Sequence, residues 1–181
     1  METINFHLKK KIKLLKDNNI QVPNLEARLL LAKALKKNLN WTYINSKKEI
    51  SNKQAQVYNK LIKKKIKKIP TAYILGYKEF YSLEFKVNEN SLIPRPETEV
   101  MIDEIKKNFN NKRKISVLDL GTGSGCILLT ILKEFKNAVG IGIDKSFDTI
   151  KLARENSKKH NLLNRSKFIN LDWNHENFFK K

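Results

Sequence analysis

Residues 117–126 form the most informative stretch of the chain, Val117-Leu118-Asp119-Leu120-Gly121-Thr122-Gly123-Ser124-Gly125-Cys126. An apolar run from residue 115 to 120 leads into the alternating glycines, and apolar residues at helical spacing follow at 127, 128, 131, 132 and 135. This order predicts a strand, a tight turn and a helix. Glycine suits such a turn because it accepts positive φ and lets a ligand approach the backbone closely. The spacing is G-x-G-x-G, whereas dinucleotide-binding folds carry G-x-G-x-x-G.

A second acidic residue, Asp144, ends the next apolar run, residues 138–143. An acid about 20 residues beyond a glycine turn typically holds the ribose hydroxyls of a nucleoside cofactor. Together with Asp119 and the glycines, Asp144 resembles the S-adenosylmethionine site of class I methyltransferases. That cofactor carries a sulfonium and an ammonium but no phosphate, so acids beside the glycines favour it. The resemblance implies cofactor contacts at Asp119, Gly121, Thr122, Gly123, Ser124, Gly125 and Asp144.

Composition leaves the meaning of a strong positive charge open. The chain has 181 residues, 40% of them hydrophobic, which allows one ordinary domain or two small ones. Its formal net charge is +19, from 37 Lys and Arg against 18 Asp and Glu. Such an excess suits a nucleic acid or ribonucleoprotein partner. A general bias towards Lys, Asn and Ile explains the same numbers.

The remaining composition points to a protein without metal, disulfide or membrane span. Cys126 is the single cysteine, which excludes an internal disulfide and favours a packing role. We expect the three histidines, His7, His160 and His175, to be ordinary surface residues, and we expect no metal site. No apolar run reaches the roughly 20 residues of a membrane helix, and the N-terminus lacks signal-peptide order, so we expect a cytoplasmic protein.

The first 70 residues predict a small helical domain. Apolar spacing predicts helices up to about residue 20, from 25 to about 37, and from 51 to about 69, with Trp41 and Tyr43 in a connector. Ser51 and Gln54 have the spacing of a capping box at the start of the third helix. The outer face of that helix is rich in lysine: Lys60, Lys63, Lys64, Lys65, Lys67 and Lys68. It is either a solvated face or an electrostatic contact for RNA or the ribosome.

Sequence character changes after residue 70. Residues 79–87 are aromatic with partial alternation, which predicts a hairpin. Thr98 is a candidate cap for a helix to about residue 109, and Ser146 for a helix to about residue 160. Residues 168–171 predict a third strand, and the nearly continuous apolar run at 115–120 predicts a strand buried on both faces. We therefore expect an α/β fold, with an all-α N-terminal domain, a hairpin linker and the first half of a Rossmann-like methyltransferase sheet.

Nearly the whole chain resembles the protein-(glutamine-N5) methyltransferases that act on peptide-chain release factors. The matching segments are residues 70–76 (PTAYILG) with 79–80 (EF), 92–99 (LIPRPETE), 117–125, 144–146 (DKS) and 172–173 (DW). The 92–99 motif is specific and implies substrate-side roles for Arg95, Glu97 and Thr98. The family resemblance also implies cofactor contacts at Asp172 and Trp173, with the indole beside the adenine. The resemblance also implies a substrate-docking domain at 1–70, a linker at 71–97 and a partial methyltransferase domain at 98–181. It implies a monomer, with a release factor as protein partner and no membrane partner.

The resemblance ends before the catalytic motif of that family. Asn-Pro-Pro-Tyr, which accepts the hydrogens of the substrate amide, does not occur in the sequence, so no catalytic residue is assigned. We expect a chain cut short, poorly stable alone and unable to methylate. The sequence therefore leaves three functions open: methylation of a release-factor glutamine, a catalytically inactive fragment that binds only cofactor or partner, and a nucleic-acid adenine methyltransferase.

Overall fold

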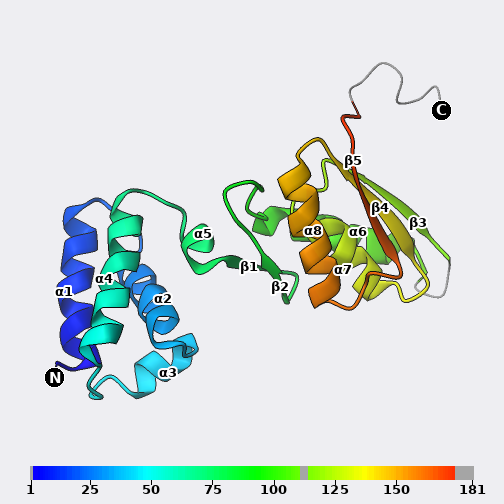
Figure 1. Ribbon diagram of the computed structural model, residues 1–181. Coiled ribbons are helices and arrows are strands. Elements are labelled where there is room, and N and C mark those ends of the chain that lie inside the picture. Colours follow the sequence, from blue (N-terminus) through cyan, green and yellow to red (C-terminus); the bar gives the residue numbers. More distant parts are fainter. Residues whose placement is uncertain (1, 111–113, 174–181) are drawn as a thin grey trace. The chain divides into compact units, whose positions relative to one another are not determined.

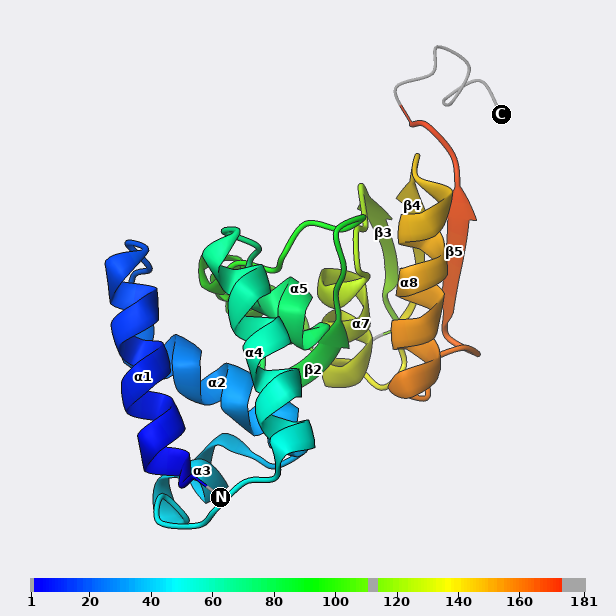
Figure 2. The same ribbon diagram turned by 60° about the vertical axis from the view of Figure 1, so that its left-hand side comes forward.

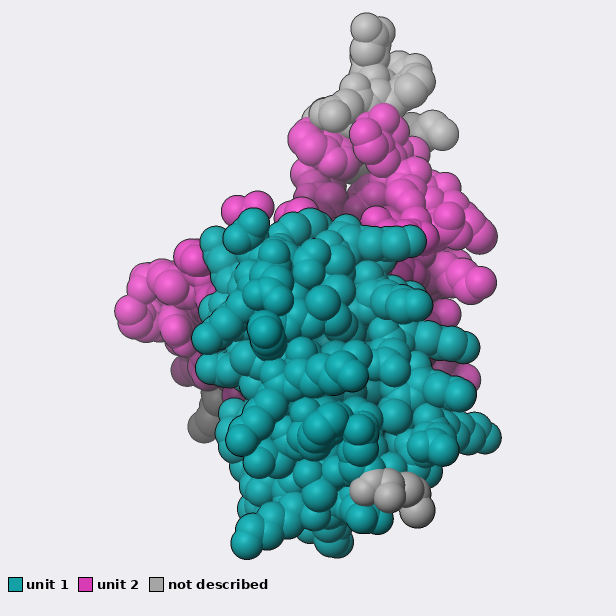
Figure 3. Space-filling view, turned by 90° about the vertical axis from the view of Figure 1, so that its left-hand side faces the viewer, with its two compact units in different colours: residues 1–75 teal, residues 76–181 magenta. Residues whose placement is uncertain are grey.

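The computed structural model describes residues 2–110 and 114–173. The chain divides into two compact units, residues 1–75 (unit 1) and residues 76–181 (unit 2), which Figure 3 shows in different colours. Unit 1 is helical, and unit 2 holds a β-hairpin and a three-stranded parallel sheet (Figure 1). The expected α/β fold class is thus confirmed. None of the described helices combines the length and apolar character that crossing a membrane would require.

Unit 1 packs its helices around one apolar core. The helices are α1 (Ile4–Asp17), α2 (Pro23–Leu35), α3 (Leu39–Ile44), α4 (Asn52–Ile66) and α5 (Thr71–Leu75). Tyr58 of α4 is fully buried in the core, and its hydroxyl donates to the carbonyl of Ala27 at 3.0 Å. The predicted capping box is confirmed: Ser51 Oγ accepts the N–H of Gln54, and the Gln54 side chain accepts the N–H of Ser51.

Two local predictions in the helices are wrong. Trp41 lies in the short helix α3 instead of a connector, because the Asn38 side chain accepts its N–H at 2.8 Å and caps the helix. Thr98 makes no side-chain cap for α6 (Glu99–Asn108), because a 3₁₀ turn, η1 (Pro96–Thr98), already holds it in helical conformation. By contrast, Ser146 caps α8 (Phe147–Lys159) as predicted.

The expectation of a surface position is also wrong for His160. This residue is 9% exposed, its ring lies 4.8 Å from the ring of Phe85, and its Nε2 lies 3.1 Å from the carbonyl oxygen of Glu84. Burial lowers the pKa of His160 below its ordinary value. His7 is partly buried, and His175 lies outside the described residues.

The hairpin of unit 2 joins β1 (Tyr77–Phe80) to β2 (Leu83–Lys86) through two residues. Tyr81 and Ser82 both have positive φ, 50° and 58°, as in a type I′ turn. Neither is glycine, so the turn needs support from outside the hairpin. Helix α6 provides it, because Glu99 accepts the N–H of Tyr81 at 2.9 Å and Asp103 accepts its hydroxyl at 2.7 Å.

The parallel sheet consists of β3 (Ser116–Leu120), β4 (Val139–Asp144) and β5 (Ser166–Asn170), in that spatial order. Helix α7 (Cys126–Glu134) connects the first two strands and α8 connects the last two. Both helices pack on the same face of the sheet (Figure 1, Figure 2). In parallel pairing, the carboxyl ends of the strands meet at one edge, so the glycine turn after β3 lies beside the end of β4.

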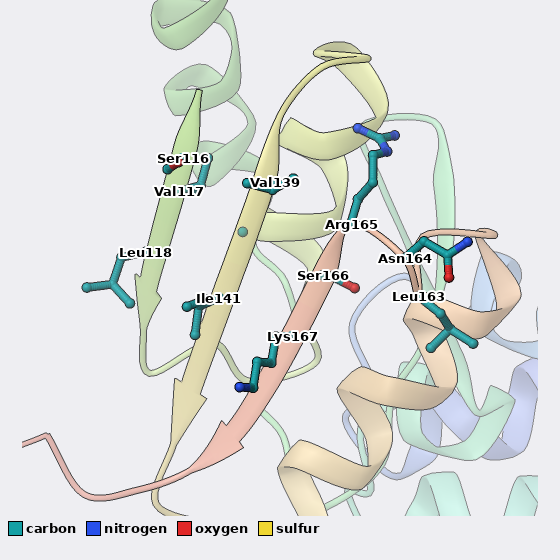
Figure 4. A pocket seen from close by; sticks show the side chains of 11 residues that line it. Ser116, Val117, Leu118, Val139, Ile141, Leu163, Asn164, Arg165, Ser166 and Lys167 are labelled. Carbon is teal, nitrogen blue, oxygen red and sulfur yellow. The ribbon is translucent and has the colours of Figure 1, made fainter. Parts of the chain in front are cut away.

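The other face of the sheet differs from the prediction of burial on both sides. Leu118 is 56% exposed there, and Val139 and Ile141 are also exposed. These side chains line a hollow of about 670 Å³ that reaches Arg165 and Lys167, and Figure 4 shows how the lining side chains lie along the three strands. The hollow lies along the first halves of the strands, whereas the glycine turn and Asp144 lie at the carboxyl edge.

The covered face of β4 has no room for side chains at its glycines. A Cβ on Gly142 would lie 2.7 Å from the Phe168 ring and 2.7 Å from Thr122 Oγ1. We expect Gly142→Ala to lower the free energy of unfolding by about 1–3 kcal/mol, because the packed ring has to move. Denaturant unfolding measures this, with the exposed Lys167→Ala as control, expected within about 0.5 kcal/mol of the parent. Equal stability of the two variants would contradict the packing argument.

Candidate functional site

The turn between β3 and α7 is anchored to the end of β4 by backbone hydrogen bonds. The N–H groups of Gly121 and Thr122 both donate to the carbonyl of Ile143, at 2.8 and 2.9 Å. The N–H of Gly123 donates to Asp144 Oδ2 at 3.1 Å, and the N–H of Ser146 donates to Asp144 Oδ1 at 3.0 Å. Each carboxylate oxygen of Asp144 thus accepts one backbone N–H, which fixes its orientation and leaves further lone pairs for a ligand.

Asp119 is the second acid of the site. Its Oδ2 accepts the hydroxyl of Thr122 at 2.7 Å, and it is only partly exposed. Burial raises the pKa of Asp119 above its ordinary value, and the charge of Asp144 nearby acts in the same direction. A cation that binds beside such a carboxylate stabilises its ionised form, which favours binding of the cation.

The three glycines of the turn serve different purposes. Gly121 and Gly123 have positive φ, 77° and 56°, and a Cβ on Gly121 would meet nothing within 4 Å. Their backbone therefore lies open for the close approach of a ligand. Gly125 also has positive φ, but its Cβ would lie 3.2–3.3 Å from Leu129, Ala153 and Phe168. Gly125 is thus required for close packing between the helices and the sheet.

A buried asparagine outside the motif holds the turn in place. Asn156 of α8 is 0% exposed, and its Nδ2 donates to the carbonyl of Ser124 at 2.9 Å. The same side chain pairs with β2, accepting the N–H of Lys86 at 2.7 Å and donating to its carbonyl at 3.0 Å. One carboxamide therefore joins α8, the hairpin and the glycine turn.

Other predicted site residues lie in two segments of unit 2. Asp172 and Trp173 follow β5 at the same carboxyl edge and are exposed, Trp173 by 39%. The N–H of Leu171 donates to the carbonyl of Asp144 at 3.0 Å and ties their segment to β4. Arg95, Glu97 and Thr98 precede α6, where the N–H of Thr98 donates to the carbonyl of Arg95 at 3.1 Å. Arg95 and Glu97 are exposed.

Sequence reasoning missed the polar residues that support the site. Asn170 donates to the carbonyls of Asp144 and Lys145, at 3.0 and 2.8 Å, and Thr149 donates to the carbonyl of Asn90 at 2.7 Å. A signal for Asn156 existed, because it falls on the helical stripe of Ala153 and the other apolar residues of α8. A polar residue in such a stripe has to find hydrogen-bond partners.

Cys126 follows the turn as a buried packing residue. Burial raises the pKa of its thiol to about 11, so the thiol stays protonated at neutral pH. Since the thiolate is the reactive form of cysteine, nucleophilic chemistry at this position is disfavoured.

We expect Asn156→Asp to destabilise unit 2 strongly and in a pH-dependent way. The introduced carboxylate would face the carbonyls of Lys86 and Ser124 without donating to them, which costs about 2–4 kcal/mol at neutral pH. Those carbonyls and the burial would raise its folded-state pKa above the unfolded value. The loss should therefore grow as pH rises from about 4 through that pKa, because the folded state prefers the protonated acid.

Urea unfolding at several pH values measures this effect on the stability of unit 2. The exposed Asn164→Asp is the control, which we expect to stay close to the parent at each pH. A pH-independent loss in Asn156→Asp would contradict the role given to the carboxamide hydrogens.

Comparison with known proteins gives independent information on both units. Residues 8–76 match the family model described as the PrmC N-terminal domain, and residues 111–180 match a methyltransferase domain. The chain is 38% identical to the release factor glutamine methyltransferase of Caulobacter vibrioides, over 88% of this chain and 55% of that protein. It is 38% identical to the protein of the same name from Buchnera aphidicola, over 96% of this chain and 62% of that protein.

A longer type of relative also matches. The chain is 37% identical to a bifunctional methyltransferase of Rickettsia typhi, over 85% of this chain and 33% of that protein. The chain thus spans about a third to three-fifths of the length of these curated relatives. Residues 8–76 are thus similar to the PrmC N-terminal domain and residues 111–180 to a methyltransferase domain, and most of this chain is similar to part of the release factor glutamine methyltransferases.

Proposed function

We propose that the carboxyl edge of the sheet binds S-adenosylmethionine. The observation that carries this proposal is the open glycine turn with a carboxylate on either side, Asp119 and Asp144. The two acids would repel a phosphate-bearing cofactor, because both are hydrogen-bonded to residues of the turn and lie close to it. A nucleoside with a cationic tail fits, because the charges are complementary and the backbone at Gly121 and Gly123 is accessible.

Each acid has a separate role in this proposal. Asp144 would accept the ribose hydroxyls, since the Gly123 and Ser146 N–H groups hold its carboxylate in a fixed orientation. Asp119 would offset the positive charge of the cofactor's ammonium group. Trp173 would lie beside the adenine, as the family resemblance implies. The cofactor itself supplies an electrophilic methyl group on its sulfonium.

We further propose that the whole protein methylates a glutamine side chain of a peptide-chain release factor. The names of the relatives and the PrmC N-terminal domain support this. Unit 1 and the segment of Arg95, Glu97 and Thr98 would face the protein substrate. Such a substrate is consistent with a cytoplasmic protein that acts near the ribosome, and a monomer is part of the same proposal. The division into a docking domain at 1–70, a linker at 71–97 and a methyltransferase part at 98–181 is part of this proposal.

The amide nitrogen of glutamine is a weak nucleophile and has to be oriented by acceptors for its hydrogens. The chain's 181 residues contain no Asn-Pro-Pro to supply them. Two other functions have to be distinguished from the proposed one by experiment. The chain would either bind the cofactor without transferring methyl groups, or methylate adenine in nucleic acid.

An assay with radiolabelled S-adenosylmethionine, a release factor and duplex DNA distinguishes the three functions. Label in a release-factor glutamine supports the proposed activity, and label in adenine supports the alternative enzyme. Cofactor binding without label in either acceptor supports the binding-only function for this chain. The absence of any cofactor binding would contradict the site as well.

For Asp144→Asn we expect S-adenosylmethionine to bind about 10- to 100-fold more weakly, because charge-assisted hydrogen bonds contribute roughly 1.5–3 kcal/mol each. Titration calorimetry measures the dissociation constant. Asp148→Asn is the matched control, since Asp148 is an exposed acid in the first turn of α8 and forms no hydrogen bond or ion pair in the part of the chain described. Equal affinities of parent and Asp144→Asn would sink the assignment.

For Asp119→Asn we expect opposite effects on folding and binding. Because the folded-state pKa of Asp119 is raised, this group's contribution to stability falls as pH rises from about 4 through that pKa. At pH 7 the amide variant should therefore be at least as stable as the parent. Its affinity for S-adenosylmethionine should be lower than that of the parent. The parent should bind more tightly as pH rises and Asp119 ionises, whereas the affinity of the variant should not change in this way. Thermal melting with and without cofactor tests both, and a variant that is destabilised but binds normally would contradict the proposal.

A further inference from the structure

Positive charge is concentrated in unit 1. Residues 1–75 contain 18 Lys and Arg against 4 Asp and Glu, a net charge of +14, whereas residues 76–181 contain 19 against 14, a net charge of +5. A general preference for lysine would affect both units alike. The two units differ more in their number of acids, 4 against 14, than in their number of basic residues, 18 against 19. A preference for lysine does not explain a scarcity of acids. The charge of unit 1 therefore calls for a specific explanation.

A polar groove lies between α1 and α4, which are neighbours in the helical unit (Figure 1). It encloses about 420 Å³ and is lined by His7, Lys10 and Lys11 from α1 and by Asn52, Gln56 and Asn59 from α4. Its rim includes one acid, Glu2, which lies 3.4 Å from His7 Nε2. The groove thus combines cations with side-chain amides.

The lysines in and beside this groove are not neutralised within the described part of unit 1. Lys10 and Lys11 line the groove, and the charge of Lys63 on α4 acts on Lys11. Lys11 is partly buried, and burial together with the charges of Lys10 and Lys63 lowers its pKa. Within residues 2–75 of the structure, Lys10, Lys11 and Lys63 form no ion pair, whereas Lys65 pairs with Glu26 at 3.1 Å. An anion in the groove would relieve the repulsion among these lysines.

Further exposed lysines lie on the same two helices. They are Lys9, Lys13 and Lys16 on α1 and Lys53, Lys60 and Lys64 on α4. These lysines are distributed along both helices, so they attract an extended polyanion more strongly than a single small anion.

One side chain that lines the groove also holds an unpaired acceptor just beneath its surface. Asn59 Oδ1 is buried and has no hydrogen-bond partner among the described residues. A phosphate diester has no hydrogen to donate to it, whereas the 2′-hydroxyl of ribose does. We propose that the groove between α1 and α4 binds the ribose-phosphate backbone of single-stranded RNA. The lysines contact phosphates, and Asn59 accepts from a 2′-hydroxyl. This inference rests on unit 1 and is independent of the proposed methyl transfer.

The test is fluorescence anisotropy of the 181-residue chain with a labelled 12-nucleotide oligouridylate across a salt series. The comparison ligands are the deoxy counterpart and a polyglutamate peptide of equal charge. We expect the RNA to bind most tightly. The triple variant Lys10→Gln, Lys11→Gln, Lys63→Gln should bind RNA about tenfold or more weakly near 0.1 M salt. Its slope of log K against log salt should be shallower by about 2, since each phosphate contact contributes about 0.7 for single strands.

Two controls make the result specific. Lys133→Gln, Lys136→Gln, Lys158→Gln removes the same charge from exposed positions of unit 2 and should leave binding nearly unchanged. Asn59→Leu should reduce the preference for RNA over the deoxy counterpart. Because the groove lysines repel one another, their replacement should not lower the melting temperature, which excludes misfolding as a cause.

Three results would overturn the proposal. Equal losses in the two triple variants would show that only total charge matters. Tighter binding of polyglutamate than of RNA would assign the groove to acidic protein segments. No RNA binding near 0.1 M salt would remove the function altogether.

Discussion

The site in unit 2 depends on one buried carboxamide. Asn156 pairs with both backbone groups of Lys86 as a neighbouring strand would, and it donates to Ser124 in the glycine turn. Because these partners lie 70 and 32 residues away, a single side chain fixes the hairpin and the turn relative to α8. Helix α8 in turn begins at Phe147, three residues after Asp144. Movement at Asn156 would therefore be transmitted to both ends of the proposed cofactor site.

At the carboxyl edge of the sheet, one acid is held in a fixed orientation and the other is unfavourable in its charged form. Backbone N–H groups orient Asp144, while burial disfavours the charge of Asp119. Packing at Gly125 and Gly142 leaves little freedom behind the turn, and Gly121 leaves its front open. A cationic nucleoside would offset the negative charge of these two acids in the bound state.

Local signals in the sequence were sufficient for much of this architecture. The alternating glycines, the capping box at Ser51 and the cap at Ser146 act within a few residues, so their patterns predict the structure directly. Asn156, Asn170 and His160 have partners far along the chain, and no local pattern reveals such partners. The exposure of Leu118 was missed because an apolar strand shows which faces suit burial but not what covers them. The site roles of Arg95, Asp172 and Trp173 remain predictions.

The order of the strands has a consequence for synthesis of the protein. The spatial order β3-β4-β5 equals the order along the chain, so each new strand can add to the edge of the strand made before it. Unit 1, with its mostly local helical contacts, can fold first while unit 2 is still being made. The hairpin β1-β2 precedes the sheet but receives Asn156 only when α8 has emerged. During translation the hairpin β1-β2 would therefore reach its final position only after α8 has been made, although the hairpin precedes α8 in the sequence.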